Sequence, residues 1–236
     1  MFINGFDILW DEIDDYVADI QSIRSIDQFM FNKPVTFFCG ENGSGKSTLL
    51  EALAIKNGLN PEGGTRNYDF STYDSYSSLH KHMRLWRSRK PDWMYFLRAE
   101  SFYNVATKEM EYSGVFSERY HDQSHGQSFF SVLMKQTNKN GLYLLDEPEA
   151  ALSCQNQLAL LYLIQSCVKQ NCQFIIATHS PILLGFPDAQ ILSFDEDKVE
   201  EVDYKSTSSY QTMKLFLDRY DYFVKDIQEN NEGGIL

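Results

Sequence analysis

Residues 35–54 have the sequence VTFFCGENGSGKSTLLEALA, and this stretch decides the fold. Val35–Cys39 is a short apolar run that stops at a glycine, which is typical of a buried strand. Residues 47–54 have helical spacing and are mostly good helix formers. Between them, Gly40–Ser47 matches the pattern G-x-x-x-x-G-K-S. The stretch is therefore predicted to form a strand, a glycine-rich loop and a helix.

A loop of this pattern is suited to binding phosphate groups. Its glycines allow tight turns that point backbone N–H groups inward, and the following helix N-terminus adds to this anion cradle. Lys46 is expected to reach the β- and γ-phosphates of ATP, and the Ser47 hydroxyl to bind Mg²⁺. The residues predicted to contact ATP are Asn42, Gly43, Ser44, Gly45, Lys46, Ser47 and Thr48.

Two carboxylates follow a second apolar run, in the sequence LYLLDEP at residues 142–148. Ligands of open α/β sheets bind at the carboxyl ends of strands. Asp146 is therefore predicted to hold Mg²⁺, directly or through water, and Glu147 to be the general base that activates the attacking water. Without the phosphate loop, an acid before a proline would indicate only a turn.

Two further motifs complete the candidate site. Ser124-His125-Gly126-Gln127 begins a predicted helix and would present N–H groups and a hydroxyl to an anion. By itself it could equally be an ordinary helix cap, but its place in order with the other motifs favours a functional role. His179 follows the apolar run at 173–177 and could hydrogen-bond a γ-phosphate or the attacking water. A lone histidine at a strand end is more often structural, but its position 32 residues after Glu147 favours a functional role.

The remaining pattern predicts an α/β fold with a mainly parallel sheet, because strands alternate with helices. The expected strands are 35–39, 93–97, 141–145, 173–177 and 189–194, and the expected helices are 47–54, 81–89, 155–169 and 210–228. The length of 236 residues suits a single domain over 1–236, with a small helical lobe inserted at about 81–135.

Composition limits the partners. The net charge of −12 disfavours nucleic acid and anionic membranes except at local basic clusters, and Lys81–Lys90 is such a cluster. This segment could bind DNA or RNA, grip a partner protein or be a solvated face. The longest apolar stretch, Leu158–Ile164, is too short to span a bilayer, and no signal peptide is evident, so a cytoplasmic protein is expected. The four cysteines match no zinc pattern and are expected to be reduced.

Together, the four motifs resemble the ABC ATPase superfamily. The phrases GENGSGKSTLLEALA, FLRAESFYN, SHGQSFF, LYLLDEPEAALS and QFIIATHSPILL are similar to small standalone bacterial ABC-type ATPases labelled "AAA family ATPase", which are related to the overcoming-lysogenization-defect and SMC-like ATPases. The resemblance implies a P-loop NTPase of the ABC-head type that binds ATP with Mg²⁺ in a head-to-tail homodimer. Each ATP would lie between the phosphate loop of one copy and Ser124, His125, Gly126 and Gln127 of the other.

Three features depart from, or leave open, the transporter pattern. Glu100 stands where transporters place a glutamine, and it could approach Mg²⁺; Ser153 stands where a loop aspartate is usual. The residue that stacks on adenine could be Tyr16, with Trp10 and Phe29 as rivals, and core packing is the commoner role of each. The 76 residues between Ser47 and Ser124 are too few for an SMC-type coiled coil.

Three functions are compatible with these residues. The first is an ATPase switch that controls a partner effector or acts on nucleic acid, which the resemblance associates with stress response or antiphage defence. The second is the nucleotide-binding subunit of a membrane transporter. The third is a module that senses ATP without turnover, which Glu147 and His179 argue against.

Overall fold

Two sheets form the framework of the protein in the computed structural model, which describes residues 1–10, 13–65, 76–99, 134, 137 and 140–229. In the described part of the chain, the larger sheet has six strands in the order β5-β6-β7-β3-β8-β9. All neighbouring pairs are parallel except β8 with β9. The strands are β3 (Val35–Cys39), β5 (Trp93–Arg98), β6 (Gly141–Asp146), β7 (Gln173–Ala177), β8 (Gln190–Ser193) and β9 (Glu200–Glu201).

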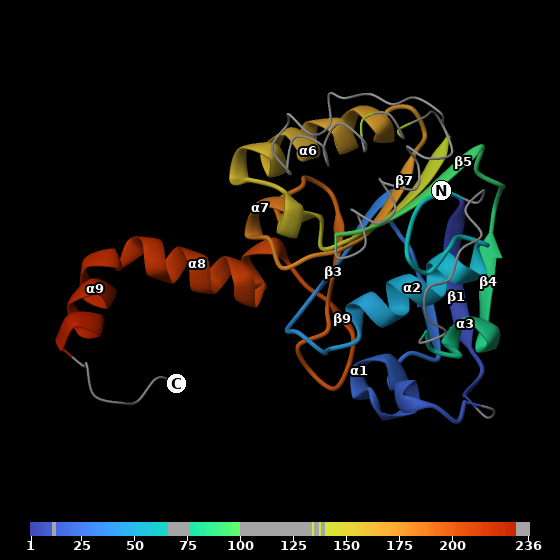
Figure 1. Cartoon of the computed structure of the whole chain (residues 1–236), viewed down its shortest axis with the longest axis horizontal. Coiled ribbons are helices and arrows are strands. Elements are labelled where there is room, and N and C mark those ends of the chain that lie inside the picture. The colour runs from blue at the N-terminus through green and yellow to red at the C-terminus, as the bar shows by residue number, and fades with distance from the viewer. Residues whose placement is uncertain (11–12, 66–75, 100–133, 135–136, 138–139, 230–236) are drawn as a thin grey trace.

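Helices cover both faces of this sheet, with α2 (Lys46–Lys56) on one side and α6 (Cys154–Val168) on the other (Figure 1). Alternate strand residues enter two separate cores, because successive side chains of a strand point to opposite faces. In β3, Phe38 belongs to the same core cluster as Leu50 and Leu53 of α2, whereas Phe37 belongs to the cluster of Leu160 and Ile164 of α6. This two-sided burial explains why the strands are continuously apolar.

The smaller sheet is antiparallel and has the order β2-β1-β4. It consists of β1 (Ile3–Ile8), β2 (Gln28–Met30) and β4 (Met83–Arg87). Gln173 of β7 ties it to the larger sheet: the buried amide accepts hydrogen bonds from the N–H groups of Phe2 (2.7 Å) and Ile3 (3.0 Å) and donates to the Ile3 carbonyl (2.8 Å). The two sheets therefore hold one another in a fixed register.

Short helical segments connect these elements, and two longer helices end the described chain. The short ones are η2 (Tyr16–Asp19), α1 (Gln21–Arg24), α3 (Leu79–His82), η4 (Pro148–Ala151), α7 (Pro181–Leu184) and η5 (Tyr204–Ser206). Helices α8 (Ser208–Asp218) and α9 (Tyr220–Glu229) project away from the body as an arm (Figure 1). Neither contains a buried residue, and Leu217 and Ile227 are 65% and 67% exposed. Among the described residues, no helix has the length and apolarity that crossing a membrane requires.

The predicted α/β class with a mainly parallel sheet is confirmed, as are its five strands to within two residues at either end. The predicted helix at 81–89 is wrong, because β4 occupies Met83–Arg87. Local helix propensity there is overridden by pairing with β1, a partner far away in the sequence, since Met83 lies opposite Ile8 and Leu85 opposite Phe6. The predicted C-terminal helix is interrupted at Arg219, whose backbone is not helical.

Within the range 81–135 expected for the inserted lobe, the structure describes β4 and β5, which belong to the two sheets. Residues 100–133 lie outside the described residues. A single domain over 1–236 stays a prediction.

Candidate active site

The phosphate-loop pattern lies between β3 and α2, as predicted. Gly40, Gly43 and Gly45 have φ values of +139°, +80° and +97°, which glycine adopts most easily. A side chain at Gly45 would also collide with α1, because a Cβ there would lie 2.8 Å from Ile23 Cδ1 and 2.9 Å from Ile20 Cγ2. The loop tip at Asn42 and Gly43 is exposed, while Ser44, Ser47 and Thr48 are half-buried.

Lys46 is buried beneath this loop and 3% exposed. Its Nζ donates to the carbonyl oxygens of Gly40 (2.8 Å) and Glu41 (2.6 Å), and it lies 3.3 Å from Ser44 Oγ. Burial lowers the pKa of Lys46, and the carboxylates of Glu147, Asp195 and Asp146 oppose that shift. The three carboxylates therefore do not fully offset the cost of burying the Lys46 ammonium under the loop. This suits the ammonium to bind phosphate oxygens.

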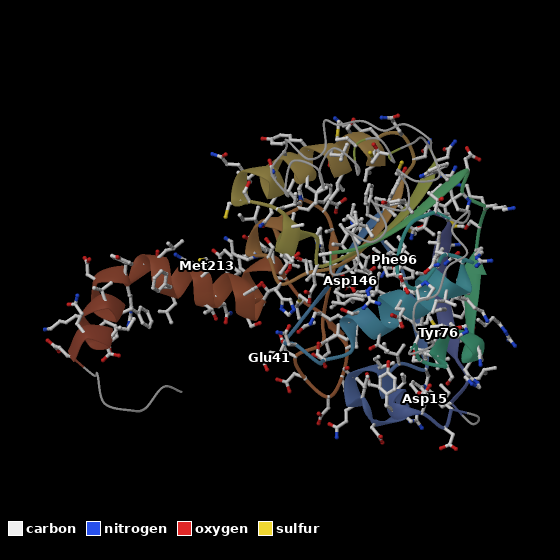
Figure 2. The ribbon with its side chains drawn as sticks, in the orientation of Figure 1. Asp15, Glu41, Tyr76, Phe96, Asp146 and Met213 are labelled. Carbon is white, nitrogen blue, oxygen red and sulfur yellow. The ribbon has the colours of Figure 1, made fainter. Side chains whose placement is uncertain are left out.

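Ser47 and Asp146 meet at the foot of the loop, where the Ser47 hydroxyl donates to Asp146 Oδ1 at 2.8 Å. Figure 2 shows Asp146 close to the end of α2 that begins with Lys46. A hydroxyl and a carboxylate oxygen are hard ligands that fit Mg²⁺, which in nucleotide sites takes only one or two protein ligands and completes its shell with water and phosphate. These two side chains are thus the pair that would hold the ion.

Arg98 and Glu51 support Asp146 from behind. Arg98 Nη1 lies 2.6 Å from Glu51 Oε2, and Arg98 Nε lies 3.4 Å from Asp146 Oδ2. The three side chains are largely buried, at 22%, 12% and 7% exposure. Burial raises the pKa of Glu51, and the Arg98 guanidinium opposes that shift. The guanidinium thus balances two carboxylates and fixes the position of Asp146.

Glu147 and His179 lie together although they follow different strands. The backbone of Glu147 is left-handed (φ +48°), and its N–H donates to the Ala177 carbonyl at 2.9 Å. Glu147 Oε1 lies 3.4 Å from His179 Nε2. That contact lacks hydrogen-bond geometry, so the buried Nε2 has no hydrogen-bond partner among the described residues. An unpartnered buried ring nitrogen beside a phosphate loop indicates a binding position for a ligand or water.

The backbone around His179 is fixed by two neighbours. The His179 N–H donates to Glu149 Oε1 at 2.6 Å. Ser180 caps α7, and its hydroxyl also donates to Gln157 Oε1 of α6 at 2.6 Å. The imidazole is therefore held from the backbone side, and its Nε2 edge is directed at Glu147.

Comparison with known proteins agrees with this geometry. Residues 18–78 match a family model described as an AAA domain, and residues 125–184 match one described as an AAA ATPase domain. An uncharacterized ABC transporter ATP-binding protein of Haemophilus influenzae is 27% identical over 183 residues, covering 66% of this chain and 68% of that protein. The cytochrome c biogenesis ATP-binding export protein CcmA of Rhizobium etli is 29% identical over 171 residues, covering 65% and 78%.

Among solved structures, a putative metal-chelate type ABC transporter in an inward-facing conformation superposes with a TM-score of 0.50. It is 17% identical, and the match covers 90% of this chain and 88% of that one. This likeness concerns the fold, which is that of a P-loop ABC ATPase head. In sequence and in fold, the chain is similar to ABC-type ATPases.

Two residues of the ATPase site were not anticipated from the sequence. Asp195, after β8, accepts from the Glu41 N–H at 2.9 Å and so anchors the phosphate loop. Glu149 belongs to the turn after Glu147 and gives no signal in the sequence, yet its carboxylate accepts the hydrogen bond of the His179 N–H. An acid directly after a strand was the available signal for Asp195, since Asp146 was found in that way.

Several predicted residues of the ATPase lie outside the described residues: Glu100, Ser124, His125, Gly126 and Gln127. Among the adenine-stacking candidates, Phe29 packs on Phe6 and Phe31, and the Trp10 ring carries the Arg24 guanidinium at 4.6 Å. Tyr16 is 53% exposed in η2, next to the helix that contacts Gly45. Of the three, only Tyr16 is exposed, since Trp10 and Phe29 are half-buried. All four cysteines are free.

Proposed function

We propose that this protein is an Mg²⁺-dependent ATPase that works as a head-to-tail homodimer around two ATP molecules and switches a partner effector or an action on nucleic acid. The single observation that carries the proposal is the 2.8 Å hydrogen bond between Ser47 and Asp146. It joins the phosphate loop to the acidic strand end and forms a ligand pair suited to the ion that accompanies ATP.

The chemistry follows from the side chains at this edge of the sheet. Lys46 binds the β- and γ-phosphate oxygens and stabilises the negative charge of the transition state. Glu147 accepts a proton from water while the water oxygen attacks the γ-phosphorus and the bond to the ADP oxygen breaks. His179 Nε2 donates to the γ-phosphate or orients the water. Mg²⁺ held by Ser47 and Asp146 would supply charge neutralisation between the phosphates.

The proposed dimer rests on the sequence motifs. The exposed loop tip of Asn42 and Gly43 supports it, since the cradle covers ATP from one side only. The second side would come from Ser124, His125, Gly126 and Gln127 of the other copy. ATP would then stabilise the dimer by linkage, and hydrolysis would weaken it.

The effector role is supported by the exposed arm of α8 and α9. Exposed apolar side chains commonly mark a protein contact when they gather on one surface, and the arm exposes several, including Leu217 and Ile227. The arm is also connected to the site, because Tyr204 of η5 donates from its hydroxyl to the carbonyl of Pro181, two residues after His179. A role in stress response or antiphage defence rests on the sequence resemblance alone.

A transporter subunit is the second candidate, favoured by the names of the curated relatives. The two functions differ in where the protein is found after cell lysis. A transporter subunit would sediment with membranes and copurify with an integral membrane protein, whereas a switch would stay in the supernatant.

The test is the variant Glu147→Gln, which keeps the shape of the side chain but cannot accept a proton. With ATP and Mg²⁺ it should bind nucleotide, lose turnover and elute as a dimer on a sizing column with light scattering. Glu229→Gln, at an exposed position at the end of α9, is the matched control and should hydrolyse ATP normally. A Glu147→Gln protein that stays monomeric with saturating ATP and Mg²⁺ would contradict the sandwich dimer.

A further inference from the structure

A second charged site lies where β4 meets the C-terminal end of α2. A cleft of about 400 Å³ opens there, and of its eight lining residues three are apolar and none is acidic. The other five form what we call the basic cleft: Lys56, Lys81, His82, Arg84 and Arg87. A volume of this size lies within the range of ligand-binding clefts.

The charge of the cleft contrasts with that of the chain. The net charge is −12, yet Lys81–Lys90 holds five of the 21 Lys and Arg residues and no acid. The nearest acids are at its margin: Arg84 Nη1 lies 3.9 Å from Asp7 Oδ2, and the arginine side chain is still 70% exposed. Asp15 interacts with His82. Among the described residues, the positive charge in the cleft is therefore mostly uncompensated by acids.

His80, which lies beside the basic cleft in the sequence, is affected by the same positive charges. The pKa of His80 is lowered first by burial and then by the positive charges of Lys81, Lys56 and His82, although its hydrogen bond to the Ser77 carbonyl acts in the opposite direction. Like charges destabilise the protonated imidazole.

The end of α2 is adapted to accept an anion. The carbonyl oxygens at a helix C-terminus repel negative charge. Here Arg87 donates to one of these oxygens, the carbonyl of Lys56 (3.2 Å), and to the side-chain Oδ1 of Asn57 (3.0 Å), and it also lines the cleft. Arg87 thus has a structural role, whereas Lys81 and Arg84 are exposed and have no such bond to the helix among the described residues.

The basic cleft is separate from the ATP site. Helix α2 begins at Lys46 in the phosphate loop and ends at Lys56 in the cleft. At 1.5 Å per residue the two ends are about 15 Å apart. One helix therefore contacts both sites. The exposed Arg89 and Lys90 follow β4 in the sequence, and Arg89 donates to the Asn171 carbonyl at 3.4 Å, outside the cleft lining.

We propose that the basic cleft binds the phosphodiester backbone of a nucleic acid. The proposed function includes an action on nucleic acid, and this proposal rests on that part of it and gives the binding surface a location. Contacts of this kind carry no base specificity and weaken as salt rises, because each neutralised phosphate releases counterions.

Fluorescence anisotropy with labelled single-stranded DNA, duplex DNA and RNA, without nucleotide and over a range of salt, tests the proposal. Binding by the parent should fall with salt. Lys81→Gln/Arg84→Gln should bind on the order of tenfold more weakly and lose about two units of the slope of log K against log salt. Lys198→Gln/Lys205→Gln removes the same charge from exposed positions elsewhere and should bind like the parent. ATPase activity and circular dichroism of each variant verify the fold.

Two further results separate this proposal from the ATPase proposal. Lys46→Ala should lose ATP binding and still bind the oligonucleotides, so a failure of one function leaves the other measurable. No oligonucleotide binding by the parent, or equal losses in both double variants, would overturn the basic cleft as a nucleic-acid site. Binding of inorganic tripolyphosphate to the cleft without any oligonucleotide binding would also overturn it and indicate a small-anion site.

Discussion

Glu147 Oε1 lies 3.4 Å from His179 Nε2, and the two residues reach this distance from neighbouring parallel strands. Asp146 and Ala177 are partners in the register of β6 with β7, so the segments that follow the two strands leave the sheet at the same level. The left-handed backbone of Glu147, followed by Pro148, then turns the carboxylate toward the imidazole. A strained backbone of this kind at a strand end is common at functional sites.

Replacing His179 with alanine should lower ATP turnover by about a hundredfold, because one positioned hydrogen-bonding group is lost at the reacting phosphate. ATP affinity should change only a few-fold, since Lys46 and the loop amides remain. Steady-state hydrolysis and nucleotide binding by fluorescence separate the two effects. His80→Ala, which alters another partly buried histidine away from the site, is the control. Unchanged turnover in His179→Ala would remove the histidine from the mechanism.

The sequence predicted the local part of this site well. The loop at Gly40–Ser47 and the acids at Asp146 and Glu147 follow strands whose apolar runs are bounded by glycine or acid, and such signals depend on neighbouring residues alone. Five of the six described strands of the larger sheet were recognisable for the same reason, and only the two-residue β9 was not predicted. What depends on spatial neighbours was not predictable: the pairing of β4 with β1, or the contact of α1 with Gly45.

The smaller sheet shows why. Residues 83–87 (MRLWR) contain good helix formers, and Trp86 masks the alternation of Met83 and Leu85. The strand exists because its backbone pairs with β1 and because the Trp86 indole donates to Asp7 at 2.9 Å. Gln173 is a similar case, since a glutamine that opens a strand gives no sign that it bonds Phe2 and Ile3.

Gly45→Ala and Gly43→Ala form a matched pair. Both glycines have positive φ, so each alanine costs about 1 kcal/mol of stability from the backbone alone. At Gly43 no atom lies within 4 Å of the added Cβ, whereas at Gly45 it meets Ile23 and Ile20 below 3.0 Å. Gly45→Ala should therefore cost about 2 kcal/mol more than Gly43→Ala, by urea unfolding. The double variant Gly45→Ala/Ile23→Ala should bring back part of the stability relative to the sum of the single changes, and strict additivity would show that the steric contact is unimportant.

The buried charge of Lys46 predicts a pH dependence of folding. Burial lowers the native pKa of Lys46 below its ordinary value of 10.5. Between those two pKa values the unfolded chain binds more protons than the native one, so this residue makes stability rise with pH there, by at most about 1.4 kcal/mol per pH unit. In Lys46→Met that contribution is absent. The free energy of unfolding of the parent minus that of the variant should therefore increase as pH rises toward 10.5.

Urea unfolding of both proteins at steps from neutral pH to about pH 10 measures this difference. Lys198→Met, which replaces an exposed lysine away from the loop, is the control for effects of charge removal alone. Saturating ATP and Mg²⁺ at neutral pH should stabilise the parent and not Lys46→Met, since only the parent binds nucleotide tightly. A difference between parent and variant that is flat across the range, or that moves in favour of Lys46→Met as pH rises, would show that Lys46 is not held as a buried ammonium under the loop.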